Sequence, residues 1–338
     1  MKTLMGIVGF RGYSGAELIR LLNGHPQASP VLMEHRPDQQ PDQQPVPGDR
    51  PVPVGHPGPP RMAATPQAAR DAGVATVFLA TPHEVSIELA PAFLAAGLRV
   101  IDLSGAFRLR TPEVYHRWYQ APPVPAALLA EAVYGLPEFY REQIRGTRFV
   151  SNPGCYPTAA NLALRPLVQA GVLDLAAGIV CDAKSGVSGA GRKPSLKTHF
   201  CEVTGNFSAY SILQHRHVPE VLQNSGIEES QFSFTAQLIP VHRGILETIY
   251  VRLNQDVDLA AIYAEAYAGE PFIRRYAAGQ VPDLQAVAGT NFCDLGVVQD
   301  GRRAVIVAAI DNLVKGAAGQ AVQNLNLMSG WAETDGML

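Results

Sequence analysis

Apolar and polar positions alternate in two different ways along this chain. In the first half, short apolar runs typical of strands are separated by segments in which Ala, Leu and Ile recur at mostly helical spacing. The strand-like runs lie at residues 3–9, 30–33, 74–80 and 98–103, and the helix-like segments lie at residues 14–23 and 85–96. This alternation predicts an α/β fold, a Rossmann-type doubly wound parallel sheet with crossover helices.

From about residue 146 the pattern changes to one typical of an α+β domain. Residues 149–150 form a short strand before the sequence SNPGCYPT, and residues 158–170 are helix-like. Longer strand-like runs follow at residues 179–183, 232–240, 246–253 and 293–310, the last interrupted by the hairpin signal Asp300-Gly301. We expect a mixed or antiparallel sheet with helices on one side, and a final helix at residues 315–328 that packs back on the first domain.

Composition narrows the classes of function. The 338 residues are 47% hydrophobic and 17% charged, and the net charge is −3. This balance gives no general attraction to nucleic acid or anionic lipid, so we expect neither partner. No apolar run approaches the roughly 18 residues of a membrane span, which favours a cytoplasmic protein that does not bind a membrane. The 4 cysteines and 9 histidines show no ligand spacing, so we predict no metal site.

A glycine-rich turn joins the first predicted strand to the first predicted helix. Gly9, Gly12 and Gly15 are three apart, which permits a tight turn, a close approach of the backbone to a pyrophosphate and close helix packing. The helix N-terminus would add N–H groups for the phosphates. An ordinary βα turn is the alternative. The candidate cofactor-binding residues in this turn are Gly9, Arg11, Gly12, Tyr13, Ser14 and Gly15.

The end of the second predicted strand bears on which dinucleotide binds. Glu34 could hold the free ribose 2′-hydroxyl of NAD, whereas Arg36 together with Arg11 could bind the 2′-phosphate of NADP. The two arginines favour NADP (NADPH) as the cofactor, and Glu34 keeps NAD as an alternative. Residues 38–60, which follow, are rich in Pro and Gln and predict a surface loop.

Cys155 is the candidate nucleophile. It follows a strand end and a Pro-Gly turn and begins a helix-like segment, where unpaired N–H groups and the helix dipole favour a thiolate and can stabilise an oxyanion. A small buried cysteine at a helix start is the alternative. Cys181 and Cys293 lie in apolar runs and Cys201 lies in a mixed segment, so for these three we expect core packing or inert partial burial.

Three polar segments could complete a site around this thiol. The segment HRHVPE contains His215, His217 and Glu220, which offer a proton acceptor and a carboxylate to orient it, although it could also be an exposed polar loop. The Gly-Ser loop at residues 184–192 could line an anion or cofactor site through its backbone N–H groups, or be a plain connector. Arg108 follows a strand end, where open α/β sheets bind ligands, although a lone Arg is more often in a surface ion pair.

In combination these motifs resemble the N-acetyl-gamma-glutamyl-phosphate reductase family, the arginine-biosynthesis member of the semialdehyde dehydrogenase group. The matching motifs follow one another along the chain as GFRGYSGAEL, ATPHEVS, DLSGAFRL, YGLPE, SNPGCYPT, SGVSGAGR, HRHVPE, LIPVHRGIL and DNLVKGAAGQAVQN. The resemblance implies a dinucleotide-binding domain of residues 1–154 and 312–338, and a substrate, catalytic and oligomerisation domain of residues 155–311. The pair Phe10-Arg11 departs from the small residues common in relatives, which bears on cofactor preference.

The resemblance also implies a role for each candidate side chain. Cys155 would be the nucleophile and His215, in preference to His217, the acid/base, with His217 and Glu220 as supporting residues. The implied substrate contacts are Arg108, Tyr210 and Arg243, and the further implied cofactor contacts are Ser188, Gly189 and Asn312.

The implied reaction is the NADPH-dependent reduction of N-acetyl-gamma-glutamyl phosphate to N-acetylglutamate 5-semialdehyde and phosphate, through a thioester on Cys155. We expect the enzyme to act on this small molecule as a homo-oligomer, a dimer or a tetramer. Two related enzymes are alternatives, aspartate semialdehyde dehydrogenase and the reductase of a blocked aminoadipyl phosphate in lysine synthesis. A nucleotide-sensing binding protein without catalysis is the alternative from another class.

Overall fold

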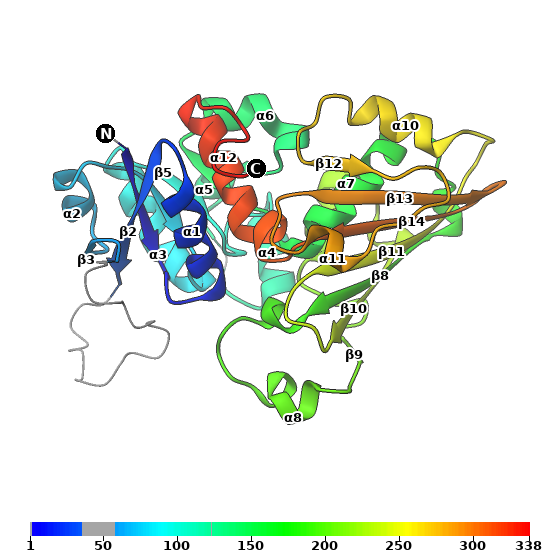
Figure 1. Ribbon diagram of the computed structural model, residues 1–338, viewed down its shortest axis with the longest axis horizontal. Coiled ribbons are helices and arrows are strands. Elements are labelled where there is room, and N and C mark those ends of the chain that lie inside the picture. Colours follow the sequence, from blue (N-terminus) through cyan, green and yellow to red (C-terminus); the bar gives the residue numbers. More distant parts are fainter. Residues whose placement is uncertain (1, 36–57, 123) are drawn as a thin grey trace. The chain divides into compact units, whose positions relative to one another are not determined.

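The chain forms two compact units in the computed structural model, which describes residues 2–35, 58–122 and 124–338 (Figure 1). The first unit contains Met1–Arg110, Val124–Asn152 and Ala318–Leu338, and the second contains Thr111–Pro123 and Pro153–Ala317. These limits describe packing, and the functional division into residues 1–154 with 312–338 and residues 155–311 remains a prediction. Arg36 and most of the predicted surface loop lie outside the described residues.

The first unit is built on a parallel sheet of seven described strands in the order β3-β2-β1-β4-β5-β7-β6. The strands are β1 (Thr3–Val8), β2 (Ala28–Glu34), β3 (Arg61–Ala63), β4 (Val74–Leu79), β5 (Arg99–Asp102), β6 (Val133–Tyr134) and β7 (Phe149–Ser151). The order runs outward in both directions from the neighbours β1 and β4. The prediction of a doubly wound parallel sheet is therefore confirmed.

Helices cover both faces of this sheet. They are α1 (Tyr13–Gly24), α2 (Pro66–Asp71), α3 (His83–Ala95), α5 (Ala126–Glu131), α6 (Pro137–Gly146) and α12 (Gly319–Ser329). The step from β1 to β2 runs opposite to the steps from β3 to β4 and from β4 to β5. Because parallel crossovers are right-handed, α1 lies on one face and α2 and α3 lie on the other.

The C-terminal helix α12 completes the core of the first unit. It packs against α1 and α6, and in Figure 1 it crosses in front of the blue N-terminal elements. Its side chains Val322 and Leu325 share one fully buried cluster with Ile7 of β1 and Leu18 of α1. The prediction that the last helix packs back on the first domain is confirmed.

The second unit contains a mixed sheet of seven described strands in the order β12-β13-β14-β11-β8-β10-β9. The strands are β8 (Ile179–Gly186), β9 (Ser208–Tyr210), β10 (Phe232–Ile239), β11 (Ile245–Arg252), β12 (Ile273–Arg275), β13 (Cys293–Asp300) and β14 (Arg303–Ile310). The pairs β8–β10 and β12–β13 are parallel and the others are antiparallel. Gly301 has a φ of +56° in the tight turn between β13 and β14, so the predicted hairpin is confirmed.

One face of this sheet is covered by α7, with α9 and α10 packed on α7. The helices of the unit are α4 (Pro112–Tyr119), α7 (Cys155–Gln169), α8 (Phe200–Val203), α9 (Val218–Ser225), α10 (Leu259–Ala266) and α11 (Leu284–Val287). Short helical turns lie at Leu175–Ala177, Val187–Ala190, Leu196–Thr198 and Glu229–Gln231, and a π-helical turn lies at Val314–Ala318. Residues Tyr156–Leu164 of α7 are all buried, so this helix is the centre of the unit.

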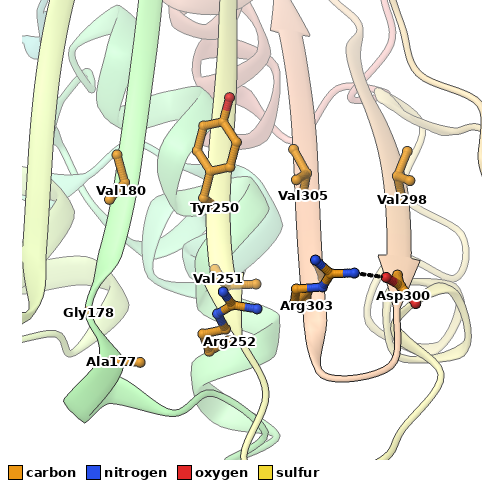
Figure 2. Close-up of a pocket in the computed structure, with 11 residues that line it drawn as sticks. Ala177, Gly178, Val180, Tyr250, Val251, Arg252, Val298, Asp300, Arg303 and Val305 are labelled. Carbon is orange, nitrogen blue, oxygen red and sulfur yellow. Dashed lines mark hydrogen bonds and ion pairs between the residues drawn. The ribbon is translucent and has the colours of Figure 1, made fainter.

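The other face of the sheet carries an apolar row across four neighbouring strands. Val298 pairs with Val305, Val305 with Tyr250, and Tyr250 with Val180, and their side chains line a hollow of about 460 Å³ (Figure 2). Val180, Tyr250 and Val298 are each 44–47% exposed. The next row is charged, since Arg303 pairs with Arg252 and forms an ion pair with Asp300.

A buried acid lies beneath α7 on the covered face. Glu247 of β11 is fully buried, and its Oε2 accepts a hydrogen bond from the Cys181 thiol of β8 at 3.6 Å. Burial raises the pKa of Glu247 well above its usual value of 4.5, so the folded protein holds this side chain protonated. Burial also raises the pKa of the Cys181 thiol, which therefore stays neutral.

Glu247→Gln is expected to stabilise the protein increasingly as the pH rises. A carboxyl group whose pKa is raised by folding binds its proton more tightly in the folded state, so the unfolding free energy falls as the pH rises above 4.5. Gln has nearly the same shape and does not ionise. Thermal unfolding at a series of pH values from about 5 to 8 should show a Tm difference that grows in favour of the variant. The exposed Glu131→Gln variant, at the end of α5, is the control, and a pH-independent difference for Glu247→Gln would contradict the prediction.

Candidate active site

The glycine turn of the first unit has no side chain at Gly9, Gly12 and Gly15. Gly9 has a φ of +82°, and a Cβ there would lie 2.2 Å from the carbonyl oxygen of Ala80. A Cβ on Gly15 would lie 2.4 Å from the Gly9 carbonyl oxygen, so both positions require glycine. Helix α1 begins at Tyr13, and no side chain caps its N-terminus. These residues fit a bound pyrophosphate, which accepts hydrogen bonds from N–H groups at such a helix start.

Arg11 and Glu34 meet at the end of β2. The Arg11 guanidinium donates to both carboxylate oxygens of Glu34, at 2.8 and 2.9 Å. Arg61 of β3 donates to the same carboxylate at 3.4 Å, and both guanidinium groups lie over the ring of Phe10. Sequence reasoning missed Arg61, because its place beside Glu34 depends on the pairing of β2 with β3. Two cations therefore surround the carboxylate that could otherwise accept a ribose hydroxyl.

Arg108 is buried in the first unit rather than lying on its surface. Its Nε donates to the Asn152 carbonyl oxygen and its terminal nitrogen donates to the Leu103 carbonyl oxygen, each at 2.8 Å. The side-chain oxygen of Asn152 accepts a hydrogen bond from Asn324 of α12 at 3.0 Å. The surface ion pair that a lone Arg suggests is therefore wrong for Arg108, which is tied to the backbone after β5 and β7.

Cys155 is the first residue of α7 in the second unit, as the sequence predicts. Gly154 is the N-cap, and no side chain caps the helix in the usual way. Instead, the Gly154 backbone N–H donates to Oε2 of the fully buried Glu220 at 2.9 Å. The Cys155 thiol is half-buried and forms no disulfide. A helix start of this kind favours the thiolate.

The other cysteines differ from Cys155 in exposure. Cys181 and Cys293 are fully buried, as expected from their apolar runs. Cys201 is exposed on α8, so the expectation that it is packed or partly buried is wrong. The helix α8 has only four residues and no buried face, which the mixed sequence around Cys201 did not reveal.

Two histidines lie immediately before α9. His215 and His217 are 9% and 8% exposed, and their rings meet edge to face with centroids 4.8 Å apart. The His217 backbone N–H donates to Nδ1 of His215 at 3.1 Å, so a neutral His215 carries its proton on Nε2. Burial, with a smaller effect of the Arg216 charge, lowers the pKa of His215 to about 4. His215 is therefore neutral at neutral pH.

Cys155 and both histidines line one cavity of about 400 Å³ in the second unit. Tyr156 and Tyr210 also line it, and their hydroxyl groups lie 3.1 Å apart. Besides the histidines, its ionisable cations are Lys197 and Arg216, whereas no Asp or Glu is among its described lining residues. The sequence analysis included Arg216 only as part of the segment HRHVPE. It did not single out Lys197, because the contribution of residues 195–198 to the cavity of Cys155 depends on the fold.

The residues predicted to contact the cofactor in the second unit lie close together. Nδ2 of Asn312 donates to Oγ of Ser188 at 3.0 Å, and its Oδ1 accepts from the backbone N–H of Gly244 at 2.7 Å. Gly189 lines the cavity that contains Cys155. Arg243, a predicted substrate contact, forms an ion pair of 3.1 Å with the buried Asp311.

Within residues 2–35, 58–122 and 124–338, no group of three or more His, Cys, Asp or Glu side chains is placed to hold a metal ion. No helix in this described part of the chain has the length and apolar character needed to cross a membrane.

Known proteins resemble this chain along its full length. It is 47% identical to the N-acetyl-gamma-glutamyl-phosphate reductase of Symbiobacterium thermophilum, with 100% of this chain and 98% of that protein covered. It is 42% identical to the Bacillus subtilis protein of the same name, over 98% of this chain and 97% of that protein. The chain belongs to the N-acetyl-gamma-glutamyl-phosphate reductase family. The resemblance found in the motifs is thereby confirmed.

Two family models match successive parts of this chain. Residues 5–147 match the semialdehyde dehydrogenase NAD binding domain, and residues 155–312 match the semialdehyde dehydrogenase dimerisation domain. The fold resembles that of aspartate semialdehyde dehydrogenase II from Vibrio cholerae, with a TM-score of 0.70 and 18% identity over 98% of this chain and 99% of that one. The structure of aspartate semialdehyde dehydrogenase with NADP from Candida albicans matches with a TM-score of 0.64 and 16% identity, over 97% of this chain and 99% of that one.

Replacing Arg216 with Gln is expected to raise the pKa of His215 from about 4, because the removed charge disfavours the imidazolium. NMR titration of protein labelled with ¹⁵N in its histidines, with His215 assigned from a His215→Gln variant, measures the midpoint. Lys193→Gln removes an exposed cation outside the lining of the cavity and should leave the midpoint unchanged. A midpoint near 6.5 in the unaltered protein would contradict the assignment of a neutral, desolvated His215.

Proposed function

We propose that this chain reduces N-acetyl-gamma-glutamyl phosphate to N-acetylglutamate 5-semialdehyde and phosphate with NADPH, in arginine biosynthesis. The observation that carries the proposal is a half-buried thiol, Cys155, at the start of α7 in a cavity that also contains His215 and His217. The full-length relatives that bear the name of this reductase support it.

Cys155 supplies covalent catalysis in this proposal. Its thiolate sulfur forms a bond to the acyl carbon, the bond from that carbon to the phosphate oxygen breaks, and phosphate leaves with the electron pair. The product of this step is a thioester on Cys155. When bound, the reduced dinucleotide supplies the hydride that converts the thioester to the aldehyde level. The carbon–sulfur bond then breaks, the aldehyde departs and Cys155 is again a thiolate.

His215 is the proposed acid/base, and His217 and Glu220 are proposed to support it. In its neutral form His215 offers an Nε2–H group, since Nδ1 accepts the His217 backbone N–H. A neutral donor of this kind stabilises the oxyanion that forms when sulfur, or later hydride, adds to the carbonyl carbon. The N–H groups at the start of α7 provide the same kind of stabilisation.

The substrate carries a carboxylate and a phosphate, and we propose cations for both. Arg108, Tyr210 and Arg243 remain the predicted contacts. Lys197 and Arg216 extend this set, because they line the cavity of Cys155 and no described lining residue is acidic. A cavity with that charge balance favours an anionic ligand.

For the dinucleotide we propose the turn containing Gly9, Gly12 and Gly15, together with Tyr13 and Ser14. In the second unit the proposed contacts are Ser188, Gly189 and Asn312. Arg11, with Arg36, is proposed to favour NADPH over NADH, since both carboxylate oxygens of Glu34 are engaged by Arg11. Arg61 adds a second described cation at that place.

We also propose that the protein is a homo-oligomer joined through the open face of the second sheet. The row of Val180, Tyr250, Val305 and Val298 is apolar, and all but Val305 are exposed, whereas Arg303 and Asp300 border it (Figure 2). A face with both apolar and oppositely charged rows can pair with a second copy of itself. The match to a dimerisation domain over residues 155–312 supports this choice.

Cys155→Ala is expected to abolish phosphate-dependent oxidation of N-acetylglutamate 5-semialdehyde, because no thiol remains to form the thioester. The reverse reaction is measured with purified protein, phosphate and either NADP or NAD, and production of reduced cofactor is followed. Cys201→Ala removes an exposed thiol and should retain activity. Mass measurement after incubation with the acyl phosphate alone should show an added acyl group on the unaltered protein and none on Cys155→Ala.

The same assay separates the alternatives. Aspartate semialdehyde and the aminoadipate analogue, tested in parallel, should be oxidised much more slowly than N-acetylglutamate 5-semialdehyde. A preference for either of these compounds would show that the proposed substrate is wrong. An acyl group found on Cys201 would show that Cys201, and not Cys155, is the nucleophile.

Val180→Asp is expected to dissociate the oligomer, because the new carboxylate would be buried without a partner at the β8 end of the apolar row. Analytical ultracentrifugation over a range of protein concentrations measures the change. Val114→Asp is the matched control, since Val114 is 38% exposed on α4 and lies outside the row. An identical mass distribution for Val180→Asp and unaltered protein would show that this face is not the interface.

A further inference from the structure

The π-helical turn Val314–Ala318 contacts the nucleophile through a glycine. A Cβ placed on Gly316 would lie 2.8 Å from Cβ of Cys155 and 3.3 Å from its Cα. Non-bonded carbon atoms do not approach to 2.8 Å in folded proteins. A side chain at position 316 therefore requires a shift of either the π-helical turn or the start of α7. The bare backbone of Gly316 is therefore one wall beside Cys155.

The turn that carries Gly316 is held firmly from behind. The Gly316 N–H donates to the Asp311 carbonyl oxygen at 2.9 Å, which closes the π-helical turn. The fully buried Asp311 carboxylate accepts the backbone N–H groups of Leu313 at 2.8 Å, Val314 at 3.2 Å and Gly289 at 2.6 Å. Any retreat of the turn would disrupt these buried hydrogen bonds.

The segment that carries Cys155 is held as well. The Gly154 N–H is bound by the buried Glu220 carboxylate at 2.9 Å. The Gly154 carbonyl oxygen accepts both the backbone N–H and the hydroxyl of Thr158, each at 3.0 Å. Neither segment can move without disrupting buried hydrogen bonds, so a Cβ on residue 316 would strain the contact with Cys155.

We infer that Gly316 is a positioning residue for the nucleophile, and this rests on the proposed role of Cys155. The absence of a Cβ at residue 316 lets the Cys155 thiol lie at the N-terminus of α7, where the helix favours its thiolate form. A methyl group there displaces the thiol from its reacting position and from the N–H groups at the start of α7. Misplacement by about 1 Å costs roughly a hundredfold in rate.

Intrinsic helix propensity alone predicts that Gly316→Ala stabilises the protein, whereas the contact with Cys155 predicts a loss of stability and activity. This difference makes the inference testable. Gly316 has no positive φ, so alanine fits its backbone conformation. Gly→Ala at such a helical position normally stabilises a protein by restricting the unfolded chain. Gly146, the last residue of α6, also lacks a positive φ, and a Cβ there would have no neighbouring atom within 4 Å. Gly146→Ala is therefore a matched control that should be active and at least as stable.

Gly316→Ala is expected to lower kcat by about a hundredfold with KM for the semialdehyde and phosphate largely unchanged. Alkylation of Cys155 by iodoacetamide, quantified by peptide mass, should slow at least tenfold relative to the exposed Cys201, and its pH midpoint should rise. Continued protection of the buried Cys181 and Cys293 shows that the variant is folded. An unchanged kcat and an unchanged ratio of Cys155 to Cys201 alkylation would overturn the inference.

A stability cycle tests the contact even in protein without activity. The Tm loss caused by Gly316→Ala should be large when residue 155 is Cys and smaller in a Cys155→Gly background, because the second Cβ of the contact is then absent. Equal Tm losses in the two backgrounds would overturn the inference. If the chain instead lacks the proposed reductase activity, the alkylation ratio and this cycle still measure whether Gly316 positions Cys155.

Discussion

One buried carboxylate fixes the parts of the second unit on which its chemistry depends. Glu220 lies in the first turn of α9, and its Oε2 holds the backbone N–H of Gly154, the residue before the nucleophile. The two histidines immediately precede α9, so the same acid joins the histidine segment to the start of α7. Losing this acceptor would leave a buried N–H without its charged partner, which is costly in a protein interior. This hydrogen bond therefore links the start of α7 to the segment that carries both histidines.

The same cavity shows how a single charge can have two effects. Arg216 lines the cavity and, together with burial, keeps His215 neutral. A cation there also attracts an anionic substrate. Once an anion lies beside Arg216, its charge is offset and protonation of His215 becomes easier. In the proposed reaction, substrate binding therefore favours protonation of His215, whereas the imidazole without substrate is a neutral hydrogen-bond donor.

The sequence predicted what depends on local spacing. The strand–helix alternation predicted the first sheet, and the longer strand-like runs predicted the second. The Pro-Gly turn before Cys155 predicted the start of α7. Turn chemistry and periodicity are properties of neighbouring residues, so they can be found in the sequence. Arg61, Lys197 and Gly316 were missed, since each matters only through a contact with a residue distant in the chain. The exposure of Cys201 was also misjudged, because a helix of four residues has no periodicity to read. For Glu220, the sequence predicted a carboxylate that orients a histidine, and spacing could not identify the Gly154 N–H that donates to it.

The place of α12 has a consequence for the order in which the protein folds during synthesis. Ala321, Val322 and Leu325 fill the same core as Ile7 and Leu18, yet a ribosome makes them only after the whole of Pro153–Ala317. The N-terminal strands and α1 therefore leave the ribosome with an apolar face that no nascent segment can yet cover. The core of the first unit stays incomplete, and vulnerable to aggregation, until Gly319–Ser329 has been made. The first unit therefore begins to be made before Pro153–Ala317 and completes its core only after that segment has been made.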